Sequence, residues 1–321
     1  MRHAHREKTL KTFLVALFAA VLSCAAAAQQ PDFKVTLLGT GSPPPVLKRF
    51  GPAVLVQAGK ETLLIDCGRG CTQRLAQAGV KLGAIDALFI THLHSDHVVG
   101  IPDLWLTGWL DSPFGTRTQP LKVWGPAGTR SMMENMQKTF QWDVDTRVAD
   151  QNLSRSAAGI NATEMAAGVV YERNGVRVSA IEVDHGELIK PAFGFRIDYD
   201  GRSVAISGDT RFSENLIKHA AGVDLLVHQV AMAKEELLAK SERVRTILAH
   251  HTKPQEAGSV FARAKPKLAV YYHFVLQGDP TVPAPTEKDV EDATRSTYAG
   301  PLVLGEDMMV FAIGKDGVTK Q

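Results

Sequence analysis

The chain has 321 residues, of which 45% are hydrophobic, with 36 Lys and Arg against 34 Asp and Glu. This composition is that of a globular protein, and it excludes collagen-like, coiled-coil and wholly disordered chains. The formal net charge is +2, but the first 28 residues contribute +3, so the remaining residues carry −1. A nearly neutral body gives no electrostatic argument for binding nucleic acid.

The N-terminus has the layout of a secretory signal peptide. A basic start precedes an apolar run at residues 13–23, and Ala26-Ala27-Ala28 offers small residues for cleavage. The run is short for a transmembrane helix, which needs about 20 residues. We therefore expect a signal peptide at residues 1–28, no membrane span in the mature protein, and a periplasmic or secreted location. A lipoprotein modified at Cys24 is less favoured, because Leu22 fits a lipoprotein cleavage box poorly.

Residues 29–321 are expected to form one domain, because no polar linker or repeat divides them. Apolar runs bounded by Gly and Pro predict strands, and patterns of helical period predict helices between them. In chain order we expect strands at 35–38, 53–56 and 62–65, a helix at 73–78, a strand at 87–90, helices at 101–110 and 130–140 around a strand at 121–124, strands at 176–183, 193–197 and 204–206, helices between 214 and 240 around a strand at 225–228, a helix at 255–264, a strand at 268–272, a helix at 288–295 and a strand at 309–313. The polar segment 143–168 is left open as a lid, an excursion or a dimer contact.

A dense group of histidines and carboxylates follows the expected strand at 87–90. The segment 91–97 reads Thr-His-Leu-His-Ser-Asp-His and contains His92, His94, Asp96 and His97. Imidazole nitrogens and carboxylate oxygens are ligands for zinc and similar metals. On an extended stretch His92 and His94 point to the same side, and the next two side chains turn with the chain as a helix begins. One loop can therefore supply two adjacent metal positions.

This segment resembles the His-x-His-x-Asp-His signature of the metallo-β-lactamase superfamily, and further motifs of that family follow in order. They are Leu38-Gly39-Thr40-Gly41, Leu64-Ile65-Asp66-Cys67-Gly68, Val183-Asp184-His185-Gly186, Ile206-Ser207-Gly208-Asp209-Thr210 and Tyr271-Tyr272-His273-Phe274. The resemblance implies an α/β fold, an αββα four-layer sandwich with a dinuclear metal site at the sheet edge. It implies a first metal on His92, His94 and His185, a second on Asp96, His97 and His273, and Asp209 bridging them.

The resemblance also implies a hydrolytic chemistry. Two Zn²⁺ ions, or Mn²⁺ or Fe²⁺ on the same ligands, would share a hydroxide that attacks an ester. Asp96 is expected to orient this nucleophile, and His251, in His251-Thr252-Lys253, is the expected proton donor, with the adjacent His250 as the alternative. Asp66 either fixes a ligand histidine or stabilises a turn.

Within the superfamily, the motifs at Gly39 and Gly208 resemble the branch that holds the tRNA 3′-processing ribonuclease Z and the arylsulfatase-like enzymes. Only 23 residues lie between His185 and Asp209, too few for the basic arm with which ribonuclease Z clamps tRNA. Its His-Glu-Ala-Thr pattern reads His-Gln-Val-Ala here, with Gln229 in place of the glutamate. An exported protein also does not meet tRNA precursors.

We therefore expect an exported dinuclear zinc hydrolase that cleaves a small ester: an aryl sulfate, a phosphodiester or a lactone. The alternative is a ribonuclease Z-like phosphodiesterase. The expected partner is a small-molecule ester rather than a nucleic acid, and a homodimer is left open. Trp105 and Trp109 form either an aromatic wall for the substrate or ordinary core. Cys67 is expected to be buried at the end of a strand, with a disulfide to Cys71 less favoured.

Overall fold

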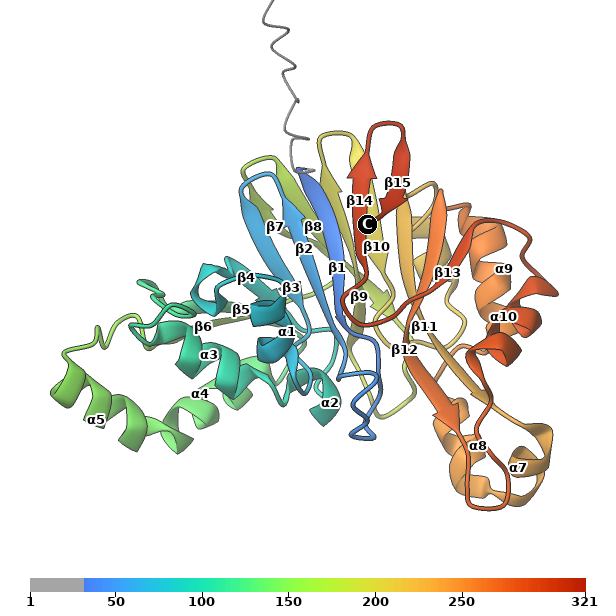
Figure 1. Ribbon diagram of the computed structural model, residues 1–321, viewed down its shortest axis with the longest axis horizontal. Helices are drawn as coiled ribbons and strands as arrows, with labels where there is room; N and C mark the ends of the chain where they lie inside the picture. The colour runs from blue at the N-terminus through green and yellow to red at the C-terminus, as the bar shows by residue number, and fades with distance from the viewer. Residues whose placement is uncertain (1–31) are drawn as a thin grey trace, which may run out of the picture. The chain divides into compact units, whose positions relative to one another are not determined.

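Two β-sheets pack face to face, and helices cover their outer faces (Figure 1). The computed structural model describes residues 32–321, so the expected signal peptide at 1–28 and Cys24 lie outside the described residues. The four layers confirm the expected αββα sandwich. In the part of the chain that is described, no helix combines the length and apolar character needed to cross a membrane.

The first sheet has eight strands. In spatial order they are β15 (Gly317–Lys320), β14 (Val310–Gly314), β1 (Phe33–Gly39), β2 (Ala53–Ala58), β3 (Glu61–Ile65), β4 (Ala87–Phe89), β5 (Leu121–Gly125) and β6 (Ile160–Glu164). The outer layer beside it contains α1 (Cys71–Gln77), η1 (Leu82–Ala84), α2 (Ser95–Val98), α3 (Ile101–Trp109), α4 (Thr129–Thr139) and α5 (Gln141–Gln151). Strands β3 to β6 run parallel, so the loops that follow β3 and β4 meet at one edge.

The second sheet has seven strands. In spatial order they are β13 (Leu302–Leu304), β12 (Leu268–Gln277), β11 (Leu225–Ala233), β10 (Arg202–Ile206), β9 (Ala192–Tyr199), β8 (Val176–Val183) and β7 (Gly168–Arg173). Its helices are α6 (Glu214–His219), α7 (Glu235–Lys240), α8 (Glu242–Leu248), α9 (Pro254–Ala264) and α10 (Glu287–Arg295). Strands β8, β10, β11 and β12 point the same way, which brings the segments after β8 and β10 to one edge.

The main core lies between the two sheets. Phe89 of the first sheet and Phe195 of the second meet there with ring centroids 5.6 Å apart. The central strands are buried on both faces, which explains why runs such as β2 and β11 are almost continuously apolar. Three further apolar clusters lie under the outer helices, one beside the first sheet and two beside the second.

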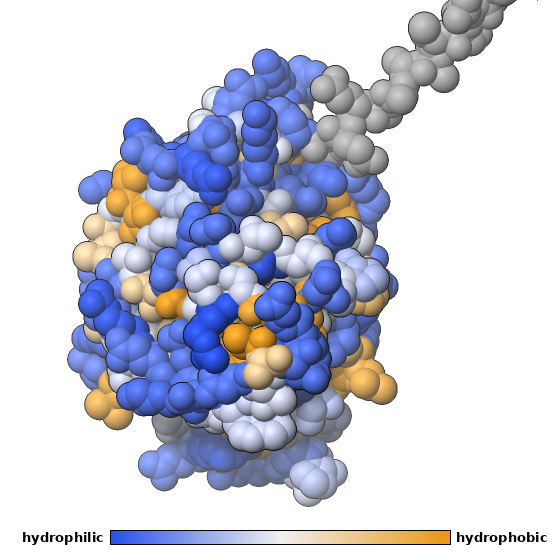
Figure 2. Space-filling view, turned by 90° about the vertical axis from the view of Figure 1, so that its left-hand side faces the viewer, coloured by the Kyte–Doolittle hydropathy of each residue, from blue (hydrophilic) through white to orange (hydrophobic). Residues whose placement is uncertain are grey.

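The segment 143–168 is not a lid. Helix α5 and the edge strand β6 account for most of it, and none of its residues lines the cavity at the expected metal edge. Its polar composition reflects exposure, since Ile160 is the only buried residue of β6 and Val144 the only one of α5. Helix α5 projects at the side of the molecule in Figure 1, and the face on that side is mostly hydrophilic with small, separate apolar groups (Figure 2).

The aromatic residues of α3 belong to the core rather than to a substrate wall. Trp105 and Trp109 are buried among the residues under the first sheet. Their indole nitrogens donate hydrogen bonds to the carbonyls of Ala158 at 2.8 Å and Ser154 at 2.9 Å. The core interpretation is therefore the one that the structure supports.

The two cysteines of the described chain are buried free thiols. Cys67 follows strand β3 and is fully buried, as expected, and it forms no disulfide with Cys71. Burial and the neighbouring Cys71 raise the pKa of the Cys67 thiol well above its usual value, which keeps it protonated and unreactive.

Candidate metal centre and active site

All seven residues expected to bind metal meet at one edge of the sandwich, although they come from both sheets. His92 and His94 follow β4, and Asp96 and His97 lie in the short helix α2. His185 follows β8, Asp209 follows β10, and His273 lies within β12. Their nitrogen and oxygen atoms form overlapping groups within 4.8 Å of one another.

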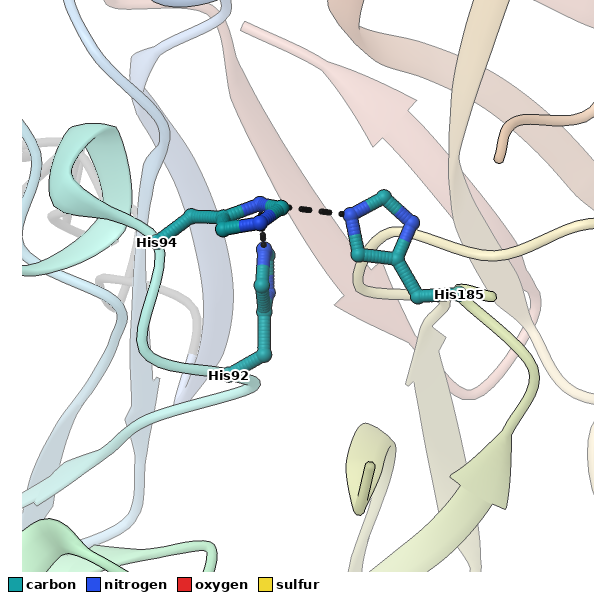
Figure 3. A group of neighbouring side chains, drawn as sticks. All are labelled: His92, His94 and His185. Carbon is teal, nitrogen blue, oxygen red and sulfur yellow. Dashed lines mark hydrogen bonds between the residues drawn. The ribbon is translucent and has the colours of Figure 1, made fainter. Parts of the chain in front are cut away.

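Three histidines form the first group (Figure 3). His92 Nε2 lies 2.9 Å from His94 Nδ1, and His185 Nε2 lies 3.4 Å from the same atom. On its other side His185 Nδ1 donates to the carbonyl of His250 at 2.9 Å. This bond fixes the hydrogen of His185 on Nδ1 and leaves Nε2 free to bind a metal.

The second group contains Asp96, His97 and His273. His273 Nε2 lies 3.2 Å from His97 Nε2 and 3.3 Å from Asp96 Oδ2. Asp209 lies between the two groups, with Oδ2 at 3.4 Å from His273, 3.5 Å from His97 and 3.7 Å from His185. This is the position that a bridging carboxylate requires.

His273 reaches the centre because strand β12 is interrupted there. Tyr272 pairs with Gln229 and Phe274 pairs with Val230, so His273 is an extra residue without a partner in β11. The φ of His273 is 44°, in the left-handed region, whereas Tyr272 and Phe274 remain paired with β11. A β-bulge of this kind redirects a side chain, and here it turns an imidazole in the middle of a strand toward the metal edge.

Asp66 fixes His97, which settles the alternative left open by the sequence. Its Oδ2 lies 2.7 Å from His97 Nδ1, and it also accepts the hydroxyl of Thr91 at 2.8 Å. Its Oδ1 accepts the backbone N–H of Thr91 at 2.8 Å. Asp66 therefore holds both the ligand histidine and the start of the metal loop, and it leaves Nε2 of His97 facing the centre.

The polar atoms of this centre fit a pair of cations. Oδ1 of Asp209 is buried and has no hydrogen-bond partner among the described residues, as expected of an oxygen that binds a cation. Burial lowers the pKa of His92 well below its usual value, and it also lowers the pKa of His185. By contrast, Asp209 and Asp66 outweigh the effect of burial and raise the pKa of His97 well above its usual value. Imidazole nitrogens that converge with carboxylate oxygens in this way form the donor set of a dinuclear metal site. The individual ligand assignments stay predictions.

A cavity of about 310 Å³ opens at the centre. Pro43 and Pro44 line it, so the proline-rich loop borders the site, and five of the expected ligands line it as well: His94, Asp96, His185, Asp209 and His273. His250 and His251 line it as well. The remaining lining residues are Arg243, Ile247, Val275 and Gln277.

His251 is oriented by Gln229 despite the missing glutamate. The side-chain nitrogen of Gln229 donates to the carbonyl of Thr210 at 2.8 Å, so its oxygen accepts from His251 Nδ1 at 3.0 Å. Burial lowers the pKa of His251 to about 3. The ring is therefore neutral at neutral pH, with its hydrogen on Nδ1 and an acceptor at Nε2. His228 packs against Phe261 in the core and does not reach the cavity.

Helix α8 and the cavity wall that it supplies were not predicted from the sequence. Arg243 and Ile247 lie on this helix, whereas the last helix expected before residue 250 ended at Lys240. The signal was available in the sequence. Ser241 is a typical N-cap, and Val244 and Leu248 stand four residues apart, as on one helix face.

Comparisons with known proteins agree with this geometry. Residues 33–255 match the family model described as anti-Pycsar protein Apyc1, which covers more than half of the chain. The chain is 37% identical to the ribonuclease Z of Mycolicibacterium gilvum (strain PYR-GCK) over 275 residues, or 86% of this chain and 94% of that protein. It belongs to the Apyc1 family and to the ribonuclease Z-like branch of the metallo-β-lactamase superfamily.

Solved structures show the same fold at lower identity. The metallo-β-lactamase fold protein YhfI from Bacillus subtilis superposes with a TM-score of 0.67 at 17% identity, over 87% of this chain and 98% of that one. Human tRNase Z, short form, gives 0.63 at 24% identity, over 88% and 99%. As a ribonuclease Z-like member of the metallo-β-lactamase superfamily, the protein is a metal-dependent hydrolase, which confirms the expectation of an enzyme.

Proposed function

We propose that this protein is a ribonuclease Z-like phosphodiesterase that works with two zinc ions. The position of Asp209 between two groups of histidines is the observation that carries the proposal, because it provides a bridging ligand for a metal pair. Relatives named ribonuclease Z, which match most of the chain, support a phosphodiester bond. They favour the ribonuclease alternative over the small ester that we expected first.

The side chains of the centre have distinct tasks in this proposal. Bound zinc ions supply positive charge to the phosphoryl oxygens and lower the pKa of water. Asp66 holds His97 by its Nδ1 hydrogen, and the carbonyl of His250 does the same for His185. Asp96, 3.3 Å from His273, has one carboxylate oxygen that can accept a hydrogen from the attacking water and so orient it.

His251 moves the proton. Gln229 keeps the hydrogen of the neutral ring on Nδ1, so the remaining nitrogen, Nε2, is the atom that exchanges protons. Nε2 takes the proton that the attacking water loses and returns it to the leaving oxygen. An amide suffices for this task, because it has only to fix the tautomer and the orientation of a neutral ring.

A small phosphodiester is the second candidate substrate. Strands β9 and β10 are joined by a tight turn at Asp200 and Gly201, whose φ values are 48° and 73°. Between His185 and Asp209 the described chain therefore has no projecting arm that could clamp tRNA. The expected signal peptide also separates the protein from tRNA precursors.

Turnover by the zinc-loaded protein, with and without chelator, tests these proposals. The substrates are a tRNA precursor, bis(p-nitrophenyl) phosphate, an aryl sulfate and a lactone. Chelator-sensitive cleavage of a phosphodiester supports the proposed function, and the ratio of precursor to aryl diester cleavage selects the substrate. Hydrolysis of the sulfate or the lactone alone would refute a phosphodiesterase.

We also propose that the protein is exported, on the pattern of residues 1–28. Fractionation of cells that express the full chain tests this proposal. Recovery of a shortened protein outside the cytoplasm is the expected result. Retention of the uncut chain in the cytoplasm would contradict it and would remove one objection to a tRNA substrate.

A further inference from the structure

We propose that Arg243 binds a second negatively charged group of the substrate, so that the enzyme prefers phosphodiesters with another phosphate next to the scissile bond. This inference rests on the proposed phosphodiesterase function and names a specificity-determining residue for it. Arg243 lines the same cavity as His94, Asp96 and Asp209. It is the only arginine or lysine among the described residues that line this cavity.

The cavity has room for more than the group that is cleaved. Its volume of about 310 Å³ falls at the lower end of cavities that hold drug-sized ligands, roughly 300–1,000 Å³. The wall formed by the expected metal ligands, such as His94 and Asp209, can hold the scissile phosphate. The wall formed by α8 and the end of β12, with Arg243, Ile247, Val275 and Gln277, is left for the neighbouring part of the substrate.

The guanidinium of Arg243 is available to an anion. Across residues 32–321 it takes part in no ion pair and no hydrogen bond, whereas nearby cations are engaged. Arg245, on the same helix, donates to the carbonyl of Leu238, and Lys240 lies 3.3 Å from Asp279. A planar guanidinium with five N–H donors matches the oxygens of a phosphate better than any other side chain.

Helix α8 holds Arg243 in a fixed relation to the reacting groups. Val244 and Leu248 anchor the helix in an apolar cluster that includes Val275 of β12. Ser241 caps the helix by accepting the N–H of Val244. The chain continues directly from this helix to His251, so the anion site and the proton-transfer residue belong to one packed unit.

The chemistry that Arg243 recognises is a phosphate adjacent to a phosphodiester. It can be an internal phosphate of an RNA strand or the terminal phosphate of a small dinucleotide. A simple aryl diester carries no such group. The inference therefore predicts a difference between substrates that share the scissile bond and differ only in the second charge.

Kinetics with matched dinucleotides test the inference. We would measure kcat/KM of the zinc-loaded protein for adenylyl-adenosine with and without a 5′-phosphate. The phosphorylated form should be preferred, and Arg243→Ala should reduce this preference about 10-fold to 100-fold, the value of a charge-assisted hydrogen bond. Arg243→Lys should restore part of it. Arg245→Ala, which removes the same charge outside the cavity, should leave the preference as it is.

The outcomes separate this inference from the proposed function. Equal cleavage of both dinucleotides, or a preference that survives Arg243→Ala, would overturn the second-phosphate site while leaving the phosphodiesterase intact. If no phosphodiester is cleaved, calorimetry with adenosine 3′,5′-bisphosphate and AMP replaces kinetics. Tighter binding of the bisphosphate that depends on Arg243 would then support the site although the proposed function had failed, and equal binding would refute it. Cleavage of a short RNA by the wild-type protein and by the Arg243 variants shows whether the second phosphate is internal or terminal.

Discussion

Asp66 and His97 are 31 residues apart in the chain, yet Oδ2 of the carboxylate lies 2.7 Å from Nδ1 of the imidazole. Both side chains are almost fully buried. The parallel pairing of β3 and β4 brings the two loops together, since Asp66 follows one strand and the histidine loop follows the other. The contact decides which nitrogen of His97 faces the metal edge.

Asp66→Ala should weaken metal binding about 10-fold to 100-fold, because it removes the group that orients His97. It also leaves the hydroxyl and N–H of Thr91 without their acceptor. Competition with a zinc-binding dye measures the affinity. Asp86→Ala is the control, since Asp86 accepts the N–H of Thr62 at the opposite end of the same strands. That variant should lose some stability and keep its affinity, and an equal loss of affinity in both would argue against a specific role for Asp66.

Asp209→Ala should remove most bound metal and lower kcat/KM by at least about 100-fold, because no other carboxylate of residues 32–321 lies between the two histidine groups. Metal analysis together with turnover measures both effects. His219→Ala is the matched control, because this histidine is exposed on α6 and bonds only to its own helix. A fully active Asp209→Ala variant with two bound metals would refute the assigned centre.

His251→Ala should lower kcat about 100-fold while metal content stays near two ions, as expected for loss of a proton-transfer group. His250→Ala should cost less than about 10-fold, because its backbone carbonyl, which accepts from His185, survives the substitution. Gln229→Leu should resemble His251→Ala, since it removes the one hydrogen-bond partner that Nδ1 of His251 has in the described part of the chain. A larger loss in His250→Ala than in His251→Ala would reverse the assignment.

Asp307→Ala should lower the free energy of unfolding by about 2–4 kcal/mol. The nearly buried carboxylate accepts the N–H and hydroxyl of Thr40, the N–H of Phe50, and an N–H of Arg74 at 3.0 Å. Asp307 thereby holds both ends of the loop at 40–50, which carries Pro43 and Pro44 of the cavity. Urea denaturation measures the change, and Asp292→Ala, which breaks an exposed pair with Lys288, should stay within about 0.5 kcal/mol.

The bulged strand β12 shows a limit of reading periodicity. The strand expected at 268–272 ends before His273, whereas β12 continues to Gln277, and only the resemblance to a family motif marked His273 as a ligand. At the bulge, the register between β12 and β11 shifts by one residue. Register depends on two strands together, so one strand's sequence does not specify it.

The sequence by itself determined the local features. It placed the buried strands, the spacing of His92, His94, Asp96 and His97, and the type of metal site, because side-chain period and donor chemistry are properties of neighbouring residues. Only the tertiary structure decided which distant groups meet. It joined Asp66 to His97 and Gln229 to His251, made segment 143–168 a helix and an edge strand, and put Arg243 on the cavity wall. These contacts depend on strand order and helix packing across the whole chain, which no local pattern encodes.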